Sequence, residues 1–451
     1  MFDFADFAGR KIAILGGGVS GVSLAMLALR LGAVPFLSDA AKISETFAGC
    51  LREAGIAFEE GGHTGKILDA DLVVAGSGFP PTARILKEIE KNRVPLVGEL
   101  DFALPYIDAK VVGITGSNGK TTTTSLVGYL LAAIGLRAAV AGNIGTPIAD
   151  YAVTEHKYDY IATELSSFQL HWARNIALAG AVVTNLAPDH IDWHGSYDNY
   201  VAAKAKILSF IKHDGFGIVQ ERDVDVLNAH RDGIYRLSWG FERGARQIVL
   251  DADSRRAFIE CGELFAFDES NLLGAHNMEN VAMALSAIHL GGQDVAVARR
   301  HLAGYVPPPH RCTLVLEKDG VRYVDDSKGT NIAATVTALS SIEGKKVIIL
   351  GGKGKGENYA TLVEPLKEFA RNAILIGEEA GVIADALTTG GFVTHSFASD
   401  MGEAVRLAAR AAEAGDVVLL SPACTSWDMY KNYGERGDHF ASLVRSIVGG
   451  A

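Results

Sequence analysis

Residues 113–121 combine the residue types that hold phosphate groups in proteins. Three glycines in this segment precede Lys120 and Thr121. Glycine lets backbone N–H groups curl around phosphate oxygens, a lysine reaches the outer phosphates, and a threonine hydroxyl can bind Mg²⁺. Ile114 stands where a strict phosphate loop has glycine. The segment predicts a nucleoside triphosphate site, and a glycine-rich turn beside a surface lysine is the simpler alternative.

Residues 16–21 form a second glycine-rich segment, with the spacing G-x-G-x-x-G. This spacing places a diphosphate on the N-terminus of a helix. Asp39 closes the next expected strand about 20 residues later, where an acidic residue would bind a ribose hydroxyl. The segment predicts a nucleotide diphosphate site, and a tight turn without a ligand is the alternative. NAD is the usual ligand of such a turn, but a nucleotide carried by a substrate fits equally well.

Two side chains suited to Mg²⁺ follow strands that are expected near the triphosphate segment. Glu164 ends one of these strands, and His190 follows the next. Because ligands of open α/β sheets bind beyond the carboxyl ends of the strands, both are candidate metal ligands. The neighbouring Asp189 and Asp192 are alternatives to His190.

Lys204 and Lys206 lie on one expected helix. Side chains two residues apart on a helix point in nearly opposite directions, so only one of the two lysines can face a site at that sheet edge. A protonated lysine cannot bind a metal ion. A solvated surface charge is therefore the simplest interpretation of each lysine.

The last third of the chain holds loops suited to anions. Arg311 and the segments 326–331, 351–356 and 421–427 fall after expected strands or in turns. Lys and Arg can neutralise carboxylates there, and small residues let the backbone come close to a ligand. We expect these loops to belong to a substrate-binding domain.

The elements that must position these residues follow an α/β rhythm. Short apolar runs alternate with helical patterns, which is typical of βαβ units and a parallel sheet. The rhythm pauses at residues 104–106, and three consecutive prolines at 307–309 favour an extended linker. We expect three α/β domains. They are a Rossmann-like domain at residues 1–108, a central P-loop ATPase-like domain at 109–308 and a second Rossmann-like domain at 309–451.

The composition is that of a folded protein with several domains. The chain has 451 residues, 48% of them hydrophobic, which is too long for one hydrophobic core. The formal net charge of −11 repels phosphate backbones and anionic lipid, so nucleic acid and membrane surfaces are poor partners. The acidic start of the chain is unlike a secretory signal, and no apolar run approaches the roughly 18 residues of a spanning helix. These features predict a cytoplasmic protein.

The cysteines are scattered along the chain and form no C-x-x-C pair. This argues against a disulfide framework and against a structural zinc site. We expect reduced, mostly buried thiols. The four cysteines are Cys50, Cys261, Cys312 and Cys424.

Taken together, the motifs resemble those of the Mur ligase family and cover essentially the whole chain. The resemblance is closest to the glutamate-adding branch, of which the last motif is characteristic. The motifs are TGSNGKT at residues 115–121, ELSSFQ at 164–169, HNMEN at 276–280, PHR at 309–311, DSKGTN at 326–331 and SPACTS at 421–426.

The resemblance implies an ATP-dependent ligase of peptidoglycan precursor synthesis. Such an enzyme joins D-glutamate to UDP-N-acetylmuramoyl-L-alanine through an acyl phosphate, with ATP and two Mg²⁺ ions. We expect these small molecules as partners of a monomer. The resemblance also selects between the two lysines, because Lys204 matches the family position at which lysine is carbamylated. A carbamate, unlike an ammonium group, can bind Mg²⁺.

The resemblance further assigns roles to individual residues, with Lys120, Glu164, His190 and Lys204 as the catalytic set. The implied ATP contacts are Gly116, Ser117, Asn118, Gly119, Lys120, Thr121, Thr122, Asn277, Arg311 and Asp326. The implied metal ligands are Thr121, Glu164, His190 and Lys204. The implied contacts of the UDP-linked substrate are Gly18, Val19, Ser20, Asp39, Ser77, Gly78, Asn143, Ser166 and His190. The implied contacts of the amino acid are Lys328, Thr330, Lys355, Ser426, Trp427 and Tyr433.

The chain departs from the family pattern at three places. Ala40 and Ala41 stand where polar or basic residues often help to hold uracil. Lys353 stands where an acidic residue is common, and its added charge bears on the preference among acidic amino acids. Tyr433 stands where an aromatic residue without a hydroxyl is common. The residues themselves do not distinguish D- from L-glutamate.

Other interpretations explain fewer motifs. A diamino-acid-adding Mur ligase is disfavoured by the motif at 421–426, and a folylpolyglutamate synthase has no need of the first nucleotide-type domain. A non-catalytic nucleotide-binding regulator would not need Lys120, Glu164 and Lys204 together. An NAD oxidoreductase built on residues 16–21 leaves the triphosphate segment unexplained.

Overall fold

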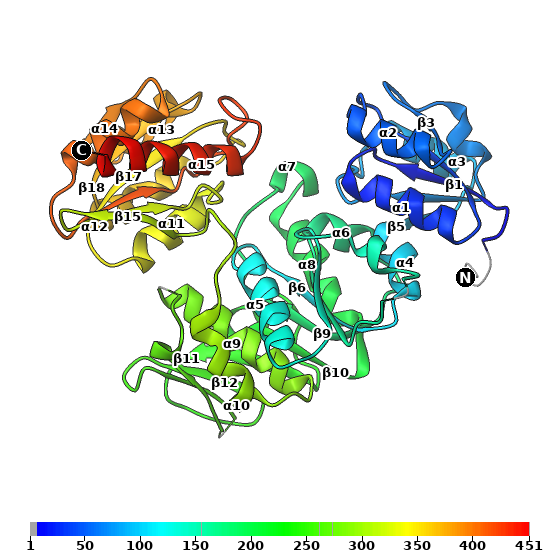
Figure 1. Ribbon diagram of the computed structural model, residues 1–451, viewed down its shortest axis with the longest axis horizontal. Helices are drawn as coiled ribbons and strands as arrows, with labels where there is room; N and C mark the ends of the chain where they lie inside the picture. The colour runs from blue at the N-terminus through cyan, green and yellow to red at the C-terminus, as the bar shows by residue number, and fades with distance from the viewer. Residues whose placement is uncertain (1–6, 155, 261, 273, 451) are drawn as a thin grey trace. The chain divides into compact units, whose positions relative to one another are not determined.

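The computed structural model describes residues 7–154, 156–260, 262–272 and 274–450. The chain divides into two compact units. The first comprises residues 1–186, 193–271 and 279–305, and the second comprises 187–192, 272–278 and 306–451. The described residues form three sheets, of five, nine and six strands, each accompanied by helices (Figure 1). The predicted α/β class is confirmed, whereas the exact domain boundaries stay a prediction.

The first sheet is parallel throughout, in the order β3-β2-β1-β4-β5. Its strands are β1 (Lys11–Leu15), β2 (Val34–Ser38), β3 (Ala57–Glu59), β4 (Leu72–Ala75) and β5 (Leu96–Gly98). Its helices are α1 (Val19–Arg30), α2 (Glu45–Glu53), α3 (Arg84–Lys91) and α4 (Glu99–Ala103). Ile12 and Ile14 of β1 pack in the core that includes α1. Ala13 and Leu15 pack on the opposite face with α3, as the alternation of side chains along a strand requires.

The second sheet has the order β14-β13-β12-β11-β10-β9-β6-β8-β7 and becomes antiparallel from β12 to β14. Its strands are β6 (Lys110–Thr115), β7 (Ala138–Gly142), β8 (Tyr160–Glu164), β9 (Leu178–Val183), β10 (Ile211–Gln220), β11 (Ile234–Trp239), β12 (Gln247–Asp251), β13 (Arg256–Ile259) and β14 (Gly262–Ala266). The helices of this region are α5 (Lys120–Ala133), α6 (Ser167–Trp172), α7 (Ile191–His194), α8 (Tyr197–Ser209), α9 (Ala275–Leu290) and α10 (Val295–Ala298). Strand β6 lies between β8 and β9, so the turn after β6 and the end of β8 share one sheet edge.

The third sheet belongs to the second unit and has the order β15-β16-β20-β17-β18-β19. Its strands are β15 (Thr313–Lys318), β16 (Val321–Asp325), β17 (Lys346–Gly351), β18 (Ala370–Ile376), β19 (His395–Phe397) and β20 (Val417–Leu420). Its helices are α11 (Ile332–Ser341), α12 (Val363–Phe369), α13 (Ala380–Thr389), α14 (Met401–Ala411) and α15 (Tyr433–Leu443). Helices α11, α12 and α13 pack on one face of the sheet, and α14 and α15 pack on the other.

The position of β20 in the third sheet brings distant loops together. Although β20 is the last strand in the sequence, it pairs in parallel with both β16 and β17. The segments that follow these three strands therefore leave the sheet at the same edge. These segments contain the motifs at 326–331, 351–356 and 421–426.

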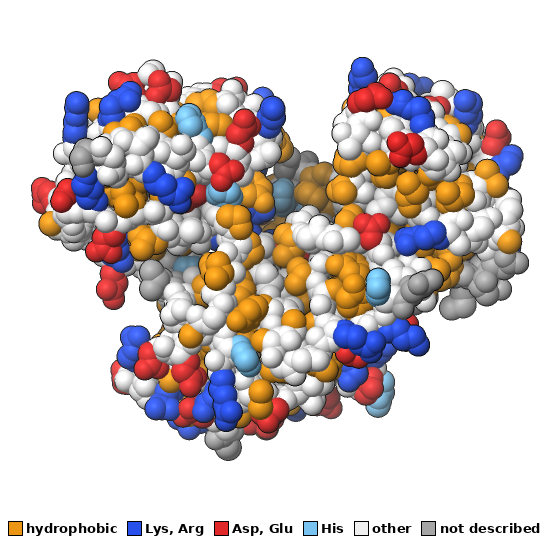
Figure 2. All heavy atoms as spheres, viewed as in Figure 1, with side chains coloured by type: hydrophobic (Ala, Val, Ile, Leu, Met, Phe, Trp, Pro, Cys, Tyr) orange, Lys and Arg blue, Asp and Glu red, His pale blue; other side chains and the backbone are white. Residues whose placement is uncertain are grey.

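The surface charges, the helix lengths and the burial of the cysteines can each be compared with the sequence analysis. On the face drawn in Figure 2, acidic and basic side chains are interspersed rather than gathered by sign. Within the described ranges, no helix has the length and apolar character needed to cross a membrane. The expected burial of the thiols is confirmed only for Cys424, since Cys50 and Cys312 are partly exposed. Cys261 lies outside the described residues.

Candidate functional site

The turn between β6 and α5 is the predicted phosphate-binding loop, and its conformation depends on glycine. Gly119 immediately precedes α5 with φ of 80°, a conformation that favours glycine. A Cβ atom at this position would also collide with the Asn280 side chain. The Lys120 ammonium lies back over the loop and donates to the carbonyls of Gly116 and Ser117, each at 2.8 Å. The loop thus holds a cation at the N-terminus of a helix, which is the arrangement that binds phosphate.

The segment that directly follows β9 forms hydrogen bonds with this loop. Asn185 accepts from the Asn118 backbone N–H at 2.9 Å and donates to the Asn118 carbonyl at 3.0 Å. The Thr184 hydroxyl donates to the same carbonyl. These bonds fix the loop in one conformation, so binding a ligand there costs less ordering of the backbone.

Glu164 and Thr121 come together as a pair of oxygen ligands. The Thr121 hydroxyl donates to one Glu164 carboxylate oxygen at 2.7 Å, and the Asn143 amide donates to the other at 2.8 Å. Glu164 and Thr121 are buried, and Asn143 is exposed. Mg²⁺ in nucleotide sites takes one or two protein oxygens, with phosphate and water oxygens completing the set. The hydroxyl and carboxylate present here fit that requirement.

Lys204 reaches the same loop from α8. It is 2% exposed, and its ammonium donates to the Gly116 carbonyl at 2.7 Å and lies 4.7 Å from the centre of the Tyr200 ring. The Tyr200 hydroxyl bonds the Ser117 hydroxyl at 2.8 Å. Interpreting Lys204 as a solvated surface charge was therefore wrong, because the length of the lysine stem carries the amine into the loop.

Lys206 points elsewhere, as the helical spacing predicted. Its ammonium donates to the His171 carbonyl at 2.7 Å. Burial lowers the pKa of Lys206 to about 8, with a further contribution from the nearby Arg174. Lys206 is partly buried, so the surface interpretation was wrong for this lysine too. Of the two lysines on α8, therefore, Lys204 is the one that contacts the phosphate-binding loop.

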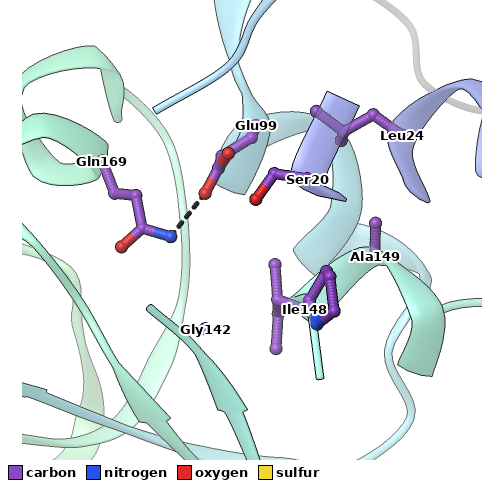
Figure 3. Close-up of a pocket in the computed structure, with 8 residues that line it drawn as sticks. Ser20, Leu24, Glu99, Gly142, Ile148, Ala149 and Gln169 are labelled. Atoms are coloured by element: carbon purple, nitrogen blue, oxygen red, sulfur yellow. Dashed lines mark hydrogen bonds between the residues drawn. The ribbon is translucent and has the colours of Figure 1, made fainter. Parts of the chain in front are cut away.

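A small pocket lies between the first glycine-rich turn and the ELSSFQ segment (Figure 3). Ser20 lines it from α1, and Glu99 and Gln169 line it from α4 and α6. The Gln169 amide donates to the Glu99 carboxylate, which also accepts from the Ser77 backbone N–H. Burial raises the pKa of Glu99. The pocket is thus bordered by α1, α4 and α6, and the buried Glu99 carboxylate links Gln169 of α6 to the Ser77 backbone.

The predicted contacts at the first glycine-rich turn have defined structural partners. Both oxygens of Asp39 accept from the backbone, at 2.5 Å from Gly17 and 2.7 Å from Ala41. Gly21 lies against the Gly16 carbonyl, where a side chain would collide with the backbone. Asp39 therefore orders the turn. Its predicted contact with a ribose stays a prediction.

Of the other predicted contacts of the UDP-linked substrate, some are accessible to a ligand and one, Ser166, caps a helix. Val19 is 57% exposed, and the space beside Gly18 and Gly78 is open. The Ser166 hydroxyl accepts from the Gln169 backbone N–H at 3.1 Å and caps α6. A cap of this kind stabilises the helix by about 1 kcal/mol. Ser166 thus has a structural role, and its contact with a substrate stays a prediction.

In the second unit, the three loops at the edge of the third sheet bond to one another. Lys353 and Thr425 exchange two backbone hydrogen bonds of 2.9 Å, and the Ala423 N–H donates to the Gly329 carbonyl at 3.0 Å. These bonds connect the three loops into one framework, and most of the predicted amino-acid contacts of the second unit lie on it. The contacts so carried are Lys328, Thr330, Lys355 and Ser426.

The side chains on this framework differ in accessibility. The Lys328 ammonium lies 3.9 Å from the centre of the Tyr433 ring. The Lys355 ammonium lies 3.9 Å from an Asp189 carboxylate oxygen. Ser426 is 2% exposed, whereas Trp427 is 70% exposed. The cations are thus held at the framework and suit a carboxylate ligand.

Other predicted site residues of the second unit lie in buried or constrained positions. His190 has φ of 52°, and its Nε2 lies 3.5 Å from an Asp189 carboxylate oxygen. Asn277 is buried, and its N–H donates to the Gly274 carbonyl at 3.1 Å. The Asp326 carboxylate accepts from the Ser421 hydroxyl at 2.7 Å. Burial raises the pKa of Asp326 to about 7, although the Ser421 hydrogen bond and the Arg311 charge oppose this.

We expect Asp326→Asn to gain stability relative to the unsubstituted protein as pH rises. The pKa of the Asp326 carboxyl is about 7 in the folded protein, compared with 3.8 for the free group. The raised pKa therefore stabilises the folded protein fully below pH 3.8, and this stabilisation is lost as the pH rises through 7. The full loss is on the order of 4 kcal/mol. Thermal unfolding of the ligand-free proteins between pH 5 and 8 measures the effect. Asp385→Asn, an exposed position on α13, is the control. A constant difference in Tm between Asp326→Asn and the unsubstituted protein would contradict the prediction.

Several residues that build the site were not identified from the sequence. Tyr200 gave no signal, because nothing in the local pattern predicts its contacts with Ser117 and Lys204. Asn280 and Gln169 lie inside motifs whose other members were assigned roles. Glu99 follows a strand and could have been found as an acidic residue at a sheet edge.

The chain matches known domain families along most of its length. Residues 11–85 match the MurD N-terminal domain, residues 114–288 the Mur ligase middle domain, and residues 310–424 the glutamate ligase domain of Mur ligases. Two similar proteins are UDP-N-acetylmuramoylalanine–D-glutamate ligases. The one from Pelotomaculum thermopropionicum is 36% identical, with 99% of each chain covered. The one from Salinibacter ruber is 36% identical, with 97% of this chain and 98% of the relative covered.

Solved structures of related fold extend the comparison to the three-dimensional level. The UDP-N-acetylmuramate-alanine ligase of Thermotoga maritima superimposes with a TM-score of 0.60 at 18% identity, covering 97% of this chain and 100% of the other. A pseudomurein peptide ligase from Methanothermus fervidus gives 0.61 at 19% identity, with the same coverage. At these identities the likeness concerns the fold alone.

Proposed function

The chain belongs to the Mur ligase family, and we propose that it joins D-glutamate to UDP-N-acetylmuramoyl-L-alanine at the expense of ATP. The reaction extends the peptide of the peptidoglycan precursor. Full-length relatives at 36% identity that carry this activity in their names support the substrate assignment. We further propose that the protein works as a monomer in the cytoplasm, and that residues 1–108, 109–308 and 309–451 are its three domains.

The arrangement around the phosphate-binding loop is the observation that carries this proposal. Lys120, Lys204 and the pair Thr121–Glu164 meet at the edge where β6 and β8 end. The loop would hold the phosphates of ATP, and Thr121 and Glu164 would hold Mg²⁺. When bound, Mg²⁺ supplies charge that offsets the negative charge of the transferring phosphoryl group. We propose a second Mg²⁺, held by His190 and by Lys204 after its carbamylation.

In the first step, the carboxylate of the UDP-linked substrate attacks the γ-phosphorus of ATP, and ADP leaves. The Lys120 ammonium offsets charge that develops on the phosphoryl oxygens. Asn143, which holds Glu164 and is exposed, would also contact the muramoyl substrate. In the second step, the amine of glutamate attacks the acyl carbon, and phosphate leaves. We assign His190 no general-base role, because a metal-bound imidazole nitrogen cannot accept a proton.

The assignment of substrates to the other residues completes the proposal. The turn at residues 16–21 would receive the diphosphate of the UDP-linked substrate, together with Asp39 and the segment at 77–78. Asn277, Arg311 and Asp326 would position ATP. The loops of the third sheet would receive the amino acid, whose carboxylates suit Lys328 and Lys355.

Phosphate release tests the proposed function directly. The purified protein is incubated with ATP, Mg²⁺, UDP-N-acetylmuramoyl-L-alanine and either D- or L-glutamate. We expect steady phosphate release with D-glutamate, and release near background with L-glutamate or when either substrate is omitted. Release that needs L-glutamate, or that does not need the UDP-linked substrate, would overturn the proposal.

A further inference from the structure

Arg436 is a buried cation that the proposed reaction does not use. It lies on α15 and is 1% exposed. Its hydrogen bonds go to neutral oxygen atoms of two loops. Burial lowers the pKa of Arg436 to about 10, which leaves the side chain protonated at neutral pH. Burying a charged group is costly unless its donors are satisfied, so a position of this kind calls for an explanation.

The guanidinium joins the loop after β16 to the loop after β20. Its Nε donates to the Ser327 hydroxyl at 2.9 Å, and Nη2 donates to the Ser327 carbonyl at 2.8 Å. Nη1 and Nη2 both donate to the Cys424 carbonyl at 3.1 Å. The planar fork of arginine can satisfy both loops at once, and a single ammonium group cannot.

The loop after β17 packs at the same point. Gly352 has φ of 134°, and a Cβ atom there would lie 3.2 Å from Nη1 of Arg436 and would collide with the Thr425 carbonyl. Thr425 follows the residue that Arg436 holds and forms the backbone pair with Lys353. The position of this third loop therefore depends on the segment that Arg436 fixes.

The segment at Ala423 and Cys424, to which Arg436 is bonded, also has a strained backbone. Ala423 has φ of 58°, a left-handed conformation that is unfavourable for a residue other than glycine. Such a conformation persists only where its surroundings enforce it. The bonds from Arg436 to the adjacent Cys424 carbonyl supply part of that constraint.

Ser327 connects Arg436 to the residues that surround the Lys328 side chain. Its hydroxyl donates to the Tyr433 carbonyl at 2.8 Å, at the start of α15. The ammonium of Lys328, the next residue along the loop, lies over the Tyr433 ring. Arg436, Ser327 and Tyr433 thus set the place of one of the two cations proposed to receive the amino acid.

We propose that Arg436 is a positioning residue for the amino-acid substrate, because its guanidinium bonds two of the three loops that carry the amino-acid contacts and lies beside the third. The claim rests on the proposed function, in which these loops bind glutamate. Arg436 itself contacts no substrate. It acts through Ser327 and Cys424 on residues such as Lys328 and Ser426.

The test compares Arg436→Met and Arg436→Lys with Arg445→Met, an exposed control in the π-helical segment Val444–Gly449 that continues α15. For Arg436→Met we expect the KM for D-glutamate to rise about tenfold or more, with less than about threefold change in the KM for ATP and for the UDP-linked substrate. Arg436→Lys should recover part of the loss, since its ammonium can reach one of the two loops. Arg445→Met should match the unsubstituted enzyme. Equal changes in all three KM values, or a loss of stability with no change in KM, would overturn the proposal.

Hydrogen exchange provides a readout that does not depend on the glutamate reaction. Arg436→Met should increase exchange in residues 326–331 and 421–427 while the strands of the third sheet stay protected. If the unsubstituted protein does not ligate glutamate, the proposed function falls, whereas this exchange pattern would still support Arg436 as the lock of the loops. Unchanged exchange in these two segments would refute the role of Arg436 in either case.

Discussion

Replacing Lys120 with methionine is expected to lower kcat/KM by about a thousandfold or more. Methionine keeps the length and apolar stem of the side chain but removes the ammonium that lies over the Gly116 and Ser117 carbonyls. The transferring phosphoryl group then loses a fixed positive charge at the moment when its own charge shifts. The measurement is steady-state phosphate release with all three substrates.

The matched control for this experiment is Lys212→Met, at an exposed position of the same unit. It should keep activity within about twofold, because a solvated lysine contributes little to a distant site. A Lys120→Met enzyme within tenfold of the unsubstituted one would show that the phosphate-binding loop does not stabilise the phosphoryl transfer.

Lys204→Ala is expected to lower kcat by about a hundredfold or more, and Lys206→Ala should leave it nearly unchanged. The two lysines share α8 but diverge. Lys204 reaches the Gly116 carbonyl, whereas Lys206 reaches the His171 carbonyl. Removing Lys204 takes away the proposed carbamate and opens buried space beside Tyr200. The readouts are kcat and the Mg²⁺ concentration needed for half-maximal rate.

Carbamylation itself has a separate readout. Formate or acetate should restore part of the activity of Lys204→Ala, because a small carboxylate can occupy the vacated space and bind the ion. The unsubstituted enzyme, after removal of dissolved CO₂ at mildly acidic pH, should regain activity when bicarbonate is added. Equal losses in Lys204→Ala and Lys206→Ala would contradict the placement, and indifference to bicarbonate and to carboxylates would contradict the carbamate.

The parts of the structure that the sequence predicted well are governed by local rules. The turn between β6 and α5 was placed to within a few residues because glycine spacing and helical periodicity are short-range signals. The positions of Glu164 and Asp326 at strand ends followed from the same alternation of strands and helices. The short strand β3, with three residues, carries too little pattern to be predicted from the sequence.

The parts that could not be predicted depend on contacts between distant residues. The placement of β20 between β16 and β17 is a property of the sheet, and without it the three loops of the second unit would not meet. The burial of Lys204 and Arg436 depends on which backbone carbonyls surround them. Pattern alone assigns such side chains to solvent, because charged residues are usually exposed.

We propose that the terminal phosphoryl group of ATP passes to a substrate carboxylate before the amide bond forms. The most direct measurement uses UDP-N-acetylmuramoyl-L-alanine with ¹⁸O in both oxygens of the alanyl carboxylate, followed by mass analysis of the released phosphate. We expect one ¹⁸O atom in each phosphate, because the carboxylate oxygen that attacks phosphorus leaves with it. Phosphate free of ¹⁸O, formed at the same rate as the amide product, would contradict the acyl-phosphate route.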